Sequence, residues 1–346
     1  MFENRNNRTE LSEIGEFGLI RILEGHVQLK QAGSLKGIGD DAAVLDSLGE
    51  KTVITKDLLL EGVHFDLSYC PLKHLGYKAV AVNLSDICAM NATPRQILVG
   101  IGLSNRFSLE AVEELYAGIL LACENYGADL VGGDTTSSAS GLTLSITAIG
   151  TVSADKLTYR SGAKVNDLVC VTGDLGAAYM GLQLLNREKK VFEETPGVQP
   201  VLEGYDYLLE RQLKPEPRYD IIRKLEEWNV LPTSMIDISD GLASEIMHIC
   251  RASNTGCQLY EEKIPVDHLT RDLAREFGLD PTVCALNGGE DYELLFTIPL
   301  SEFEKVKDKT EISVIGHITD AAAGYKLVDR QDNVHALTAQ GWDAFR

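Results

Sequence analysis

The sequence predicts a mixed α/β protein of the α+β class, built as two lobes. The chain has 346 residues, enough for two ordinary domains, and 44% of them are hydrophobic, which can supply a sizeable core. Short apolar stretches typical of strands come in runs, with segments of helical period between them. A polar, turn-rich segment at 153–167 separates two such series. We therefore expect an N-terminal domain at 1–152 and a C-terminal domain at 153–346.

The first half of the chain contains both helical and strand-like segments. Residues 11–27 have apolar side chains near helical spacing and predict a helix. From residue 37 onward, short apolar stretches end in small and acidic residues. We expect further helices at 71–90 and 108–127 and strands at 37–45, 51–60, 95–103 and 141–152.

The second half twice shows a strand followed by a turn and a helix. Residues 167–185 predict a strand, a glycine turn and a helix, and residues 234–254 predict a strand, an acidic turn and a helix. The segment at 186–206 is polar and contains prolines, so we expect a loop over much of its length. We expect one more helix within 213–228 and strands at 288–298 and 312–318.

Composition argues against several classes of function. The formal net charge is −20 and the pI is about 4.8, with no basic stripe, which argues against nucleic acid as a partner. The apolar runs are too short to span a bilayer, and the polar N-terminal residues lack the apolar core of a signal peptide. The seven cysteines are scattered and form no CxxC pair, which is typical of reduced thiols. We expect a cytoplasmic protein that does not bind a membrane.

Acidic turns recur along the chain, each after an apolar stretch or a glycine. They contain Asp40 and Asp41, Asp57, Asp86, Asp134, Asp237 and Asp240, and Glu290 and Asp291. A single Asp after a strand is commonly a helix cap or a turn residue, and this interpretation stays open for Asp134 and Asp240. It does not explain why GIGDD, NLSD, GGDTT and DISDG all occur in one strongly acidic chain. Carboxylates without a basic partner need a cation, and oxygen ligands select Mg²⁺ or Ca²⁺. The neighbouring Gly, Ser and Thr residues suit a phosphate ligand.

Other familiar catalytic and nucleotide-binding motifs are absent from the sequence. It has no Walker A loop, no GxGxxG opening a helix, no HExxH, no EF-hand loop and no GxSxG. His64 belongs to no histidine cluster and by itself is typical of a packing or turn residue. Arg160 lies close to a glycine, so it is either a phosphate contact or a solvated surface arginine.

Nine motifs, taken together and in order, resemble the thiamine-monophosphate kinase family. They are GIGDDAAVL, DLLLEGVHF, YKAVAVNLSDICAMNATP, LVGGDTT, LTYRSGAK, VTGDLG, IDISDGL, GGEDYEL and a terminal GW, and they extend along nearly the whole chain. That family is part of a larger ATP-binding superfamily with aminoimidazole ribonucleotide synthetase, selenophosphate synthetase and a hydrogenase-maturation protein.

The resemblance implies ATP-dependent phosphorylation of thiamine monophosphate to thiamine diphosphate, the final step of thiamine diphosphate biosynthesis. It implies direct in-line transfer of the γ-phosphate, assisted by several Mg²⁺ ions and without a phospho-enzyme. It further implies a homodimer in which the N-terminal α/β lobes pair strands in a shared β-barrel, and a C-terminal α/β sandwich that closes over ATP.

The resemblance also implies a role for particular residues, none of which is a catalytic acid, base or nucleophile. The implied metal ligands are Asp40, Thr55, Lys56, Asp57, Asp86, Asp134, Asp237 and Asp240. The implied ATP contacts are Asp40, Tyr116, Gly133, Asp134, Arg160 and Ser239. The implied contacts with thiamine phosphate are His64, Glu290 and Trp342. Lys56 departs from the small residue usual at its position and can offer only its backbone carbonyl, and Tyr116 is alternatively a half-buried helix residue.

Two other functions compete with this one. The first is another enzyme of the superfamily, but the first cysteine is Cys70, too late for the reactive cysteine of selenophosphate synthetases. The chain also ends in GWDAFR, without the C-terminal cysteine of the hydrogenase-maturation relative. The second is a non-catalytic acidic protein that binds a divalent metal without nucleotide. EGVHF and the terminal GW favour thiamine phosphate over a ribonucleotide.

Overall fold

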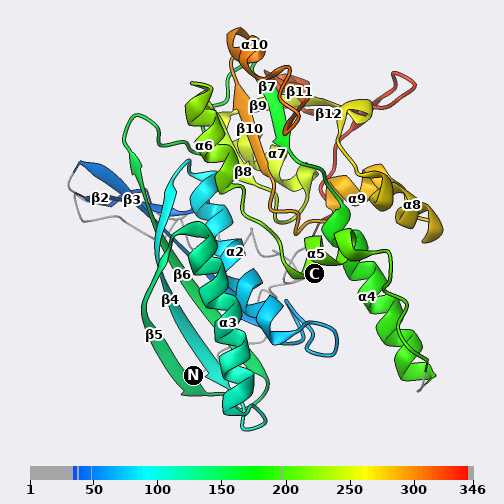
Figure 1. Cartoon of the computed structure of the whole chain (residues 1–346). Helices are drawn as coiled ribbons and strands as arrows, with labels where there is room; N and C mark the ends of the chain where they lie inside the picture. Colours follow the sequence, from blue (N-terminus) through cyan, green and yellow to red (C-terminus); the bar gives the residue numbers. More distant parts are fainter. Residues whose placement is uncertain (1–33, 37–38, 48, 196–197, 342–346) are drawn as a thin grey trace, which may run out of the picture.

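The computed structural model describes residues 34–36, 39–47, 49–195 and 198–341. These residues form two lobes, each built around one β-sheet (Figure 1). The mixed α/β class and the two-lobed arrangement predicted from the sequence are therefore confirmed. The helix expected at 11–27 lies outside the described residues.

The N-terminal lobe contains a six-stranded sheet. The strand order is β1 (Ser34–Lys36), β2 (Ala43–Ser47), β3 (Glu50–Leu60), β6 (Leu142–Ser153), β4 (Thr93–Leu103) and β5 (Asp129–Ser137). Neighbouring strands are antiparallel except β4 and β5, which are parallel. The long strands β3, β4 and β6 were all expected, and β5 was not.

Two helices, α2 (Leu72–Ala89) and α3 (Leu109–Tyr126), pack on each other, and α2 packs on one face of this sheet. Alternate residues of β6 are buried, which is the period-two pattern of a strand with one face against a core. The two helices approach closely at a pair of glycines. A Cβ added to Gly76 would lie 2.0 Å from the Leu115 carbonyl oxygen, and one added to Gly118 would lie 1.9 Å from that of Lys73.

The C-terminal lobe contains a seven-stranded sheet. The strand order is β13 (Val334–Ala336), β12 (Tyr325–Val328), β9 (Thr255–Tyr260), β11 (Ile312–Asp320), β7 (Leu168–Thr172), β10 (Leu294–Ile298) and β8 (Ser234–Asp237). All neighbours are antiparallel except β9 and β12. Strands β9, β12 and β13 were not expected from the sequence.

Helices cover both faces of this second sheet. The helices α7 (Leu242–Ser253) and α9 (Pro281–Asn287) pack on one face, and α6 (Tyr219–Glu227) and α10 (Phe303–Val306) pack on the other. Cys88 and Ala89, at the end of α2, are buried in the core that α6 and α10 form with this second sheet. Helix α2 therefore joins the two lobes, and its polar residues can reach both.

A further group of helices extends beside the C-terminal sheet: α4 (Ala177–Glu194), α5 (Asp206–Leu213) and α8 (His268–Glu276) (Figure 1). The loop expected at 186–206 is wrong for its first part, because α4 continues to Glu194. That part is rich in helix-forming residues and carries ion pairs between side chains four residues apart, Lys189 with Glu193 and Lys190 with Glu194. No helix among the described residues is long and apolar enough to cross a membrane.

Candidate active site between the two lobes

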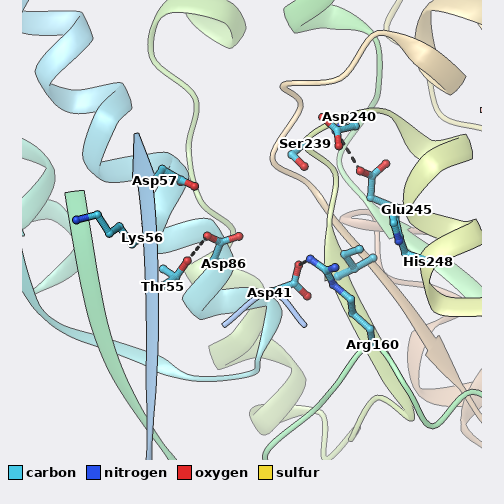
Figure 2. Close-up of a pocket in the computed structure, with 11 residues that line it drawn as sticks. Asp41, Thr55, Lys56, Asp57, Asp86, Arg160, Ser239, Asp240, Glu245 and His248 are labelled. Carbon is cyan, nitrogen blue, oxygen red and sulfur yellow. Dashed lines mark hydrogen bonds and ion pairs between the residues drawn. The ribbon is translucent and has the colours of Figure 1, made fainter. Parts of the chain in front are cut away.

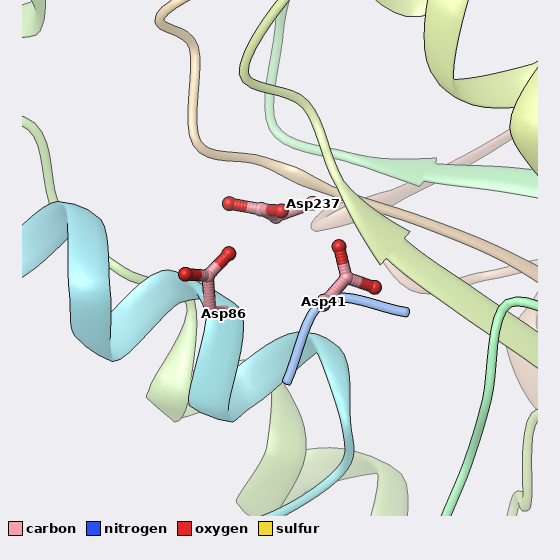
Figure 3. Close-up of side chains that lie close together, drawn as sticks. All are labelled: Asp41, Asp86 and Asp237. Carbon is pink, nitrogen blue, oxygen red and sulfur yellow. The ribbon is translucent and has the colours of Figure 1, made fainter. Parts of the chain in front are cut away.

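Three aspartates from distant parts of the chain meet where the lobes join (Figure 3). Asp86 lies on α2, Asp237 ends strand β8, and Asp41 lies in the bend before β2. One carboxylate oxygen of each lies within 4.8 Å of the others. Asp57 of β3 adds to this cluster, because it shares with Asp86 the lining of both cavities described below.

The polar residues of the NLSD motif hold the cluster in place. Ser85 donates a hydrogen bond to Oδ2 of Asp237 at 2.6 Å, and Asn83 accepts one from the backbone N–H of Asp57 at 3.0 Å. The Thr55 hydroxyl donates to Oδ2 of Asp86 at 2.6 Å. The positioning roles of Asn83 and Ser85 were not predicted, although both lie within the recognised motif.

The cluster carries more negative charge than its surroundings can stabilise. Burial raises the pKa of Asp57 to about 6. Burial, together with the nearby Asp41 carboxylate, raises the pKa of Asp237 to about 7. Burial and the charge of Asp57 raise the pKa of Asp86 well above its ordinary value. Oδ2 of Asp41 is buried and has no hydrogen-bond partner among the described residues. These all-oxygen donors, short of positive charge, fit a hard divalent cation such as Mg²⁺.

Arg160 supplies positive charge at the edge of this cluster. Its guanidinium forms an ion pair with Asp41 (Figure 2). Although burial lowers its pKa, the charge of Asp41 raises it further, so Arg160 remains a cation. Asp40 lies 3.7 Å from the Lys36 ammonium and accepts a hydrogen bond from the Arg160 backbone N–H at 3.2 Å. Thus Asp41, which was not among the predicted ligands, is the member of the pair that joins the cluster.

A polar cavity of about 280 Å³ opens beside the cluster (Figure 2). Its lining includes the predicted residues Thr55, Lys56, Asp57, Asp86, Arg160, Ser239 and Asp240. The Lys56 side chain points away from the other labelled residues (Figure 2). Glu245 and His248 of α7 also line this cavity and were not predicted. Glu245 accepts a hydrogen bond from the Asp240 backbone N–H at 3.1 Å and so holds the acidic turn.

A second cavity of about 540 Å³ adjoins the first. Asp57, Asp86, Ser239 and Asp240 line both. The rest of its wall is largely apolar and aromatic, including Leu59, Val63, Phe65, Tyr69, Val82, Leu182 and Leu213. The predicted substrate residues His64 and Glu290 both line it. This lining suits an organic molecule whose anionic end reaches the acidic cluster and its cations.

The remaining predicted residues lie elsewhere in this chain. Gly133 and Asp134 are exposed on the edge strand β5, and Tyr116 is on α3, partly packed against the core of its lobe. The register places Gly133 three strands from Asp57, which is about 14 Å at the usual strand spacing. The structure therefore does not bring these three residues to the cluster within one chain. Trp342 lies outside the described residues.

The chain is similar in sequence to known proteins over most of its length. Residues 39–152 match the family described as AIR synthase related protein, N-terminal domain. The thiamine-monophosphate kinase of Aquifex aeolicus is 34% identical over 302 residues, covering 87% of this chain and 92% of the relative. That of Bacillus subtilis is 34% identical over 318 residues, covering 90% and 93%. That of Escherichia coli K12 is 38% identical over 288 residues, covering 82% and 83%.

Solved structures show the same relationship. The structure of AaThiL complexed with AMPPCP and TMP matches with a TM-score of 0.82 and 30% identity, covering 97% of this chain and 99% of that one. Thiamine-monophosphate kinase from Stenotrophomonas maltophilia matches with a TM-score of 0.71 and 32% identity, covering 89% and 94%. The hydrogenase maturation protein HypE in complex with ATP, at 19% identity and a TM-score of 0.67 over 96% and 98%, shares the fold. The chain therefore belongs to the thiamine-monophosphate kinase family.

Proposed function

We propose that this protein transfers the γ-phosphate of ATP to the phosphate of thiamine monophosphate, releasing thiamine diphosphate and ADP as the final step of thiamine diphosphate biosynthesis. The observation that carries the proposal is the junction of the two cavities, where Asp57 and Asp86 line both. Donor and acceptor phosphates must meet at one point for direct transfer, and this junction offers such a point. The AaThiL structure, which is complexed with AMPPCP and TMP, supports the proposal.

We propose that Asp41, Asp57, Asp86 and Asp237 hold Mg²⁺ at this junction. The predicted ligands Asp40, Thr55, Lys56, Asp134 and Asp240 remain part of the proposal. Bound Mg²⁺ would supply the positive charge that lets two anionic phosphates approach and that stabilises the transition state. Arg160 adds a fixed cation on the side of the first cavity, where it can contact ATP.

The reaction needs no general base from the protein. The acceptor oxygen belongs to a phosphate that is already largely ionised near neutral pH. The work of the chain is then to position both phosphates and to stabilise charge, which agrees with a site built of metal ligands. We therefore propose direct transfer without a phospho-enzyme.

We propose further that the protein acts as a homodimer through the N-terminal sheet. The face of this sheet opposite α2 exposes apolar side chains, among them Leu58 at 50% and Leu60 at 36%. In the register, Leu58 shares its row with Ser145, Gly100 and Asp134, and small residues there allow a second sheet to approach closely. If Asp134 binds metal together with Asp57, as predicted, it must do so at the site of a second copy, because Asp57 lies on the other face.

A shared site can be tested by complementation. Asp57→Asn and Asp134→Asn are each expected to be inactive alone, and mixed dimers of the two would regain one intact site. Restored activity on co-expression supports the shared site, and its absence in isolated mixed dimers contradicts it.

All seven cysteines are free and buried, which supports the proposed cytoplasmic location, where thiols stay reduced.

The experiment that tests the function is one reaction. Purified protein is mixed with MgATP and thiamine monophosphate, and the products are resolved by chromatography. A thiamine diphosphate peak that is absent without Mg²⁺ supports the proposal. If no such peak forms but the protein still binds ATP in a Mg²⁺-dependent way, the fold assignment stands and the phosphate acceptor is a molecule other than thiamine monophosphate.

A further inference from the structure

The carboxylate of Glu290, in the wall of the second cavity, is held by two buried residues. The Lys78 ammonium lies 3.0 Å from Oε1 of Glu290, and the Gln212 side-chain amide donates to Oε2 at 2.7 Å. Lys78 also donates to the backbone carbonyl of Gln212 at 3.0 Å. The three residues therefore form a closed triangle, and each oxygen of the carboxylate has its own donor.

This triangle joins three separate elements at one wall of the cavity. Lys78 comes from α2, Gln212 from α5, and Glu290 from the turn before β10. Lys78 is only 4% exposed and Gln212 5%, whereas the Glu290 side chain is 31% exposed. A lysine so deeply buried requires a partner, and here the partner is the member of the triangle that is most open to the cavity.

The backbone of the turn is fixed as tightly as the side chain. Glu290 and Tyr292 both have positive φ, at 57° and 53°, a conformation that residues other than glycine rarely adopt. Their N–H groups donate to the carbonyl oxygens of Ser239 at 2.6 Å and Ile238 at 2.8 Å. Strained positions of this kind persist where the surroundings determine them strongly, and they gather at binding sites.

The ion pair changes what Glu290 can offer a ligand. Thiamine phosphate carries a cationic thiazolium and an aminopyrimidine with N–H donors. A lone carboxylate would attract the cation, but the Lys78 ammonium at 3.0 Å offsets that charge. The oriented carboxylate keeps lone pairs that can accept a hydrogen bond from an N–H group.

We propose that Lys78 and Gln212 are positioning residues that orient Glu290 as a hydrogen-bond acceptor for an N–H donor on the organic part of the phosphate acceptor. Specificity at this wall then comes from the direction of the hydrogen bond that Glu290 accepts and not from the net charge of the wall. The inference rests on the proposed function, since it assigns the organic substrate to the second cavity.

The direction in which the KM for thiamine monophosphate changes distinguishes two roles of Glu290, an oriented hydrogen-bond acceptor and a simple countercharge. Lys78→Met keeps an unbranched side chain, one heavy atom shorter, and removes its charge. If Lys78 orients Glu290, the KM for thiamine monophosphate rises about tenfold, the size of one lost hydrogen bond to a charged group, while the KM for ATP stays unchanged. If Glu290 acts as a simple countercharge, the more negative wall binds the cationic substrate more tightly, the KM falls, and the proposal is overturned.

Gln212→Leu provides an independent variant because it removes the second donor without altering charge. It is expected to raise the same KM and to leave the KM for ATP unchanged. Lys224→Met is the matched control, since Lys224 pairs with Glu311 at 2.8 Å in the C-terminal lobe, outside both cavities, and its loss should change neither KM.

A double variant tests whether Lys78 acts through Glu290. In a Glu290→Gln background, Lys78→Met should raise the KM for thiamine monophosphate no further, and the double variant should melt higher than Glu290→Gln because no unpaired ammonium remains buried. A second, additive rise would mean that Lys78 contacts the substrate itself and would overturn the positioning role.

Wild-type protein is assayed first. If it makes no thiamine diphosphate, the proposed function fails, whereas activity with an unchanged KM in both single variants defeats only this inference.

Discussion

The hydroxyl of Ser85 donates a hydrogen bond to Oδ2 of Asp237 across 2.6 Å. Both side chains are buried, and the bond connects α2 of the first lobe to the end of β8 in the second. One short contact therefore sets how an aspartate of the C-terminal lobe faces an aspartate of the N-terminal lobe. The geometry of the acidic cluster depends on how the lobes are docked as well as on which residues are acidic.

Ser85→Ala should weaken metal binding without removing a ligand. Asp237 would lose its orienting donor, and loss of such a supporting contact typically costs about 10- to 100-fold in metal affinity or activity. The measurement is the Mg²⁺ concentration that gives half-maximal turnover. Ser234→Ala is the control, because this buried hydroxyl lies on the same strand and contacts Thr297 at 2.7 Å. Equal effects of the two changes would show that Ser85 matters only for packing.

Asp57→Asn should reduce turnover by more than about 100-fold, beyond the loss usual for a residue that only supports a ligand. The protein should still fold, because burial raises the pKa of Asp57 to about 6 and the neutral amide removes an unfavourable charge. The melting temperature without metal is therefore expected to stay level or rise. Normal turnover in this variant would place Asp57 outside the site.

The metal-free protein should lose stability as the pH rises. Burial raises the pKa of Asp237 to about 7, so the folded state holds a proton that the unfolded chain releases near pH 4. This stabilisation is complete below about pH 4 and is lost as the pH rises through about 7. Melting temperatures of wild type and Asp237→Asn, followed in a chelator from about pH 5 to 8, should diverge, with the wild type falling more steeply. Parallel curves would contradict the raised pKa.

Removal of divalent metal should abolish tight ATP binding. The first cavity is lined by five acidic residues, Asp41, Asp57, Asp86, Asp240 and Glu245, against Arg160 and Lys56, and the Lys56 side chain points away from them, so a bare polyphosphate would meet repulsion. Calorimetric titration with ATP in excess chelator should show no binding, and added Mg²⁺ should restore it. Tight ATP binding in the absence of metal would remove the basis of the proposed site.

Gly118→Ala should destabilise the N-terminal lobe. The new Cβ would lie 1.9 Å from the Lys73 carbonyl oxygen, so α3 must move away from α2. Overpacking of this kind typically costs about 1–3 kcal/mol, and a backbone contact leaves little room to relax. Denaturant unfolding measures the loss, and Glu114→Ala on the exposed side of α3 is the control. A loss no larger than that of the control would mean that the helices separate easily.

The sequence alone determined much of the local structure. Strands β3, β4 and β6 and helices α2 and α3 lie where apolar periodicity placed them, because the period of side-chain burial is set by neighbours a few residues apart. The errors also have local causes. The first part of the 186–206 segment is polar but helix-forming, and strands such as β12 are short and only partly buried, so they carry little alternation.

The sequence also determined which chemical groups are available, namely repeated carboxylates beside Gly, Ser and Thr. It could not determine which of them meet. Asp41, Asp86 and Asp237 converge because α2 is docked against both sheets, and because Asp41 reaches the cluster whereas its neighbour Asp40 pairs with Lys36. Asp134 belongs to a similar acidic motif, GGDTT, but lies on the face of its sheet opposite α2. The choice depends on long-range register and packing, which no short stretch of sequence encodes, and the Lys78–Glu290 pair arises in the same way.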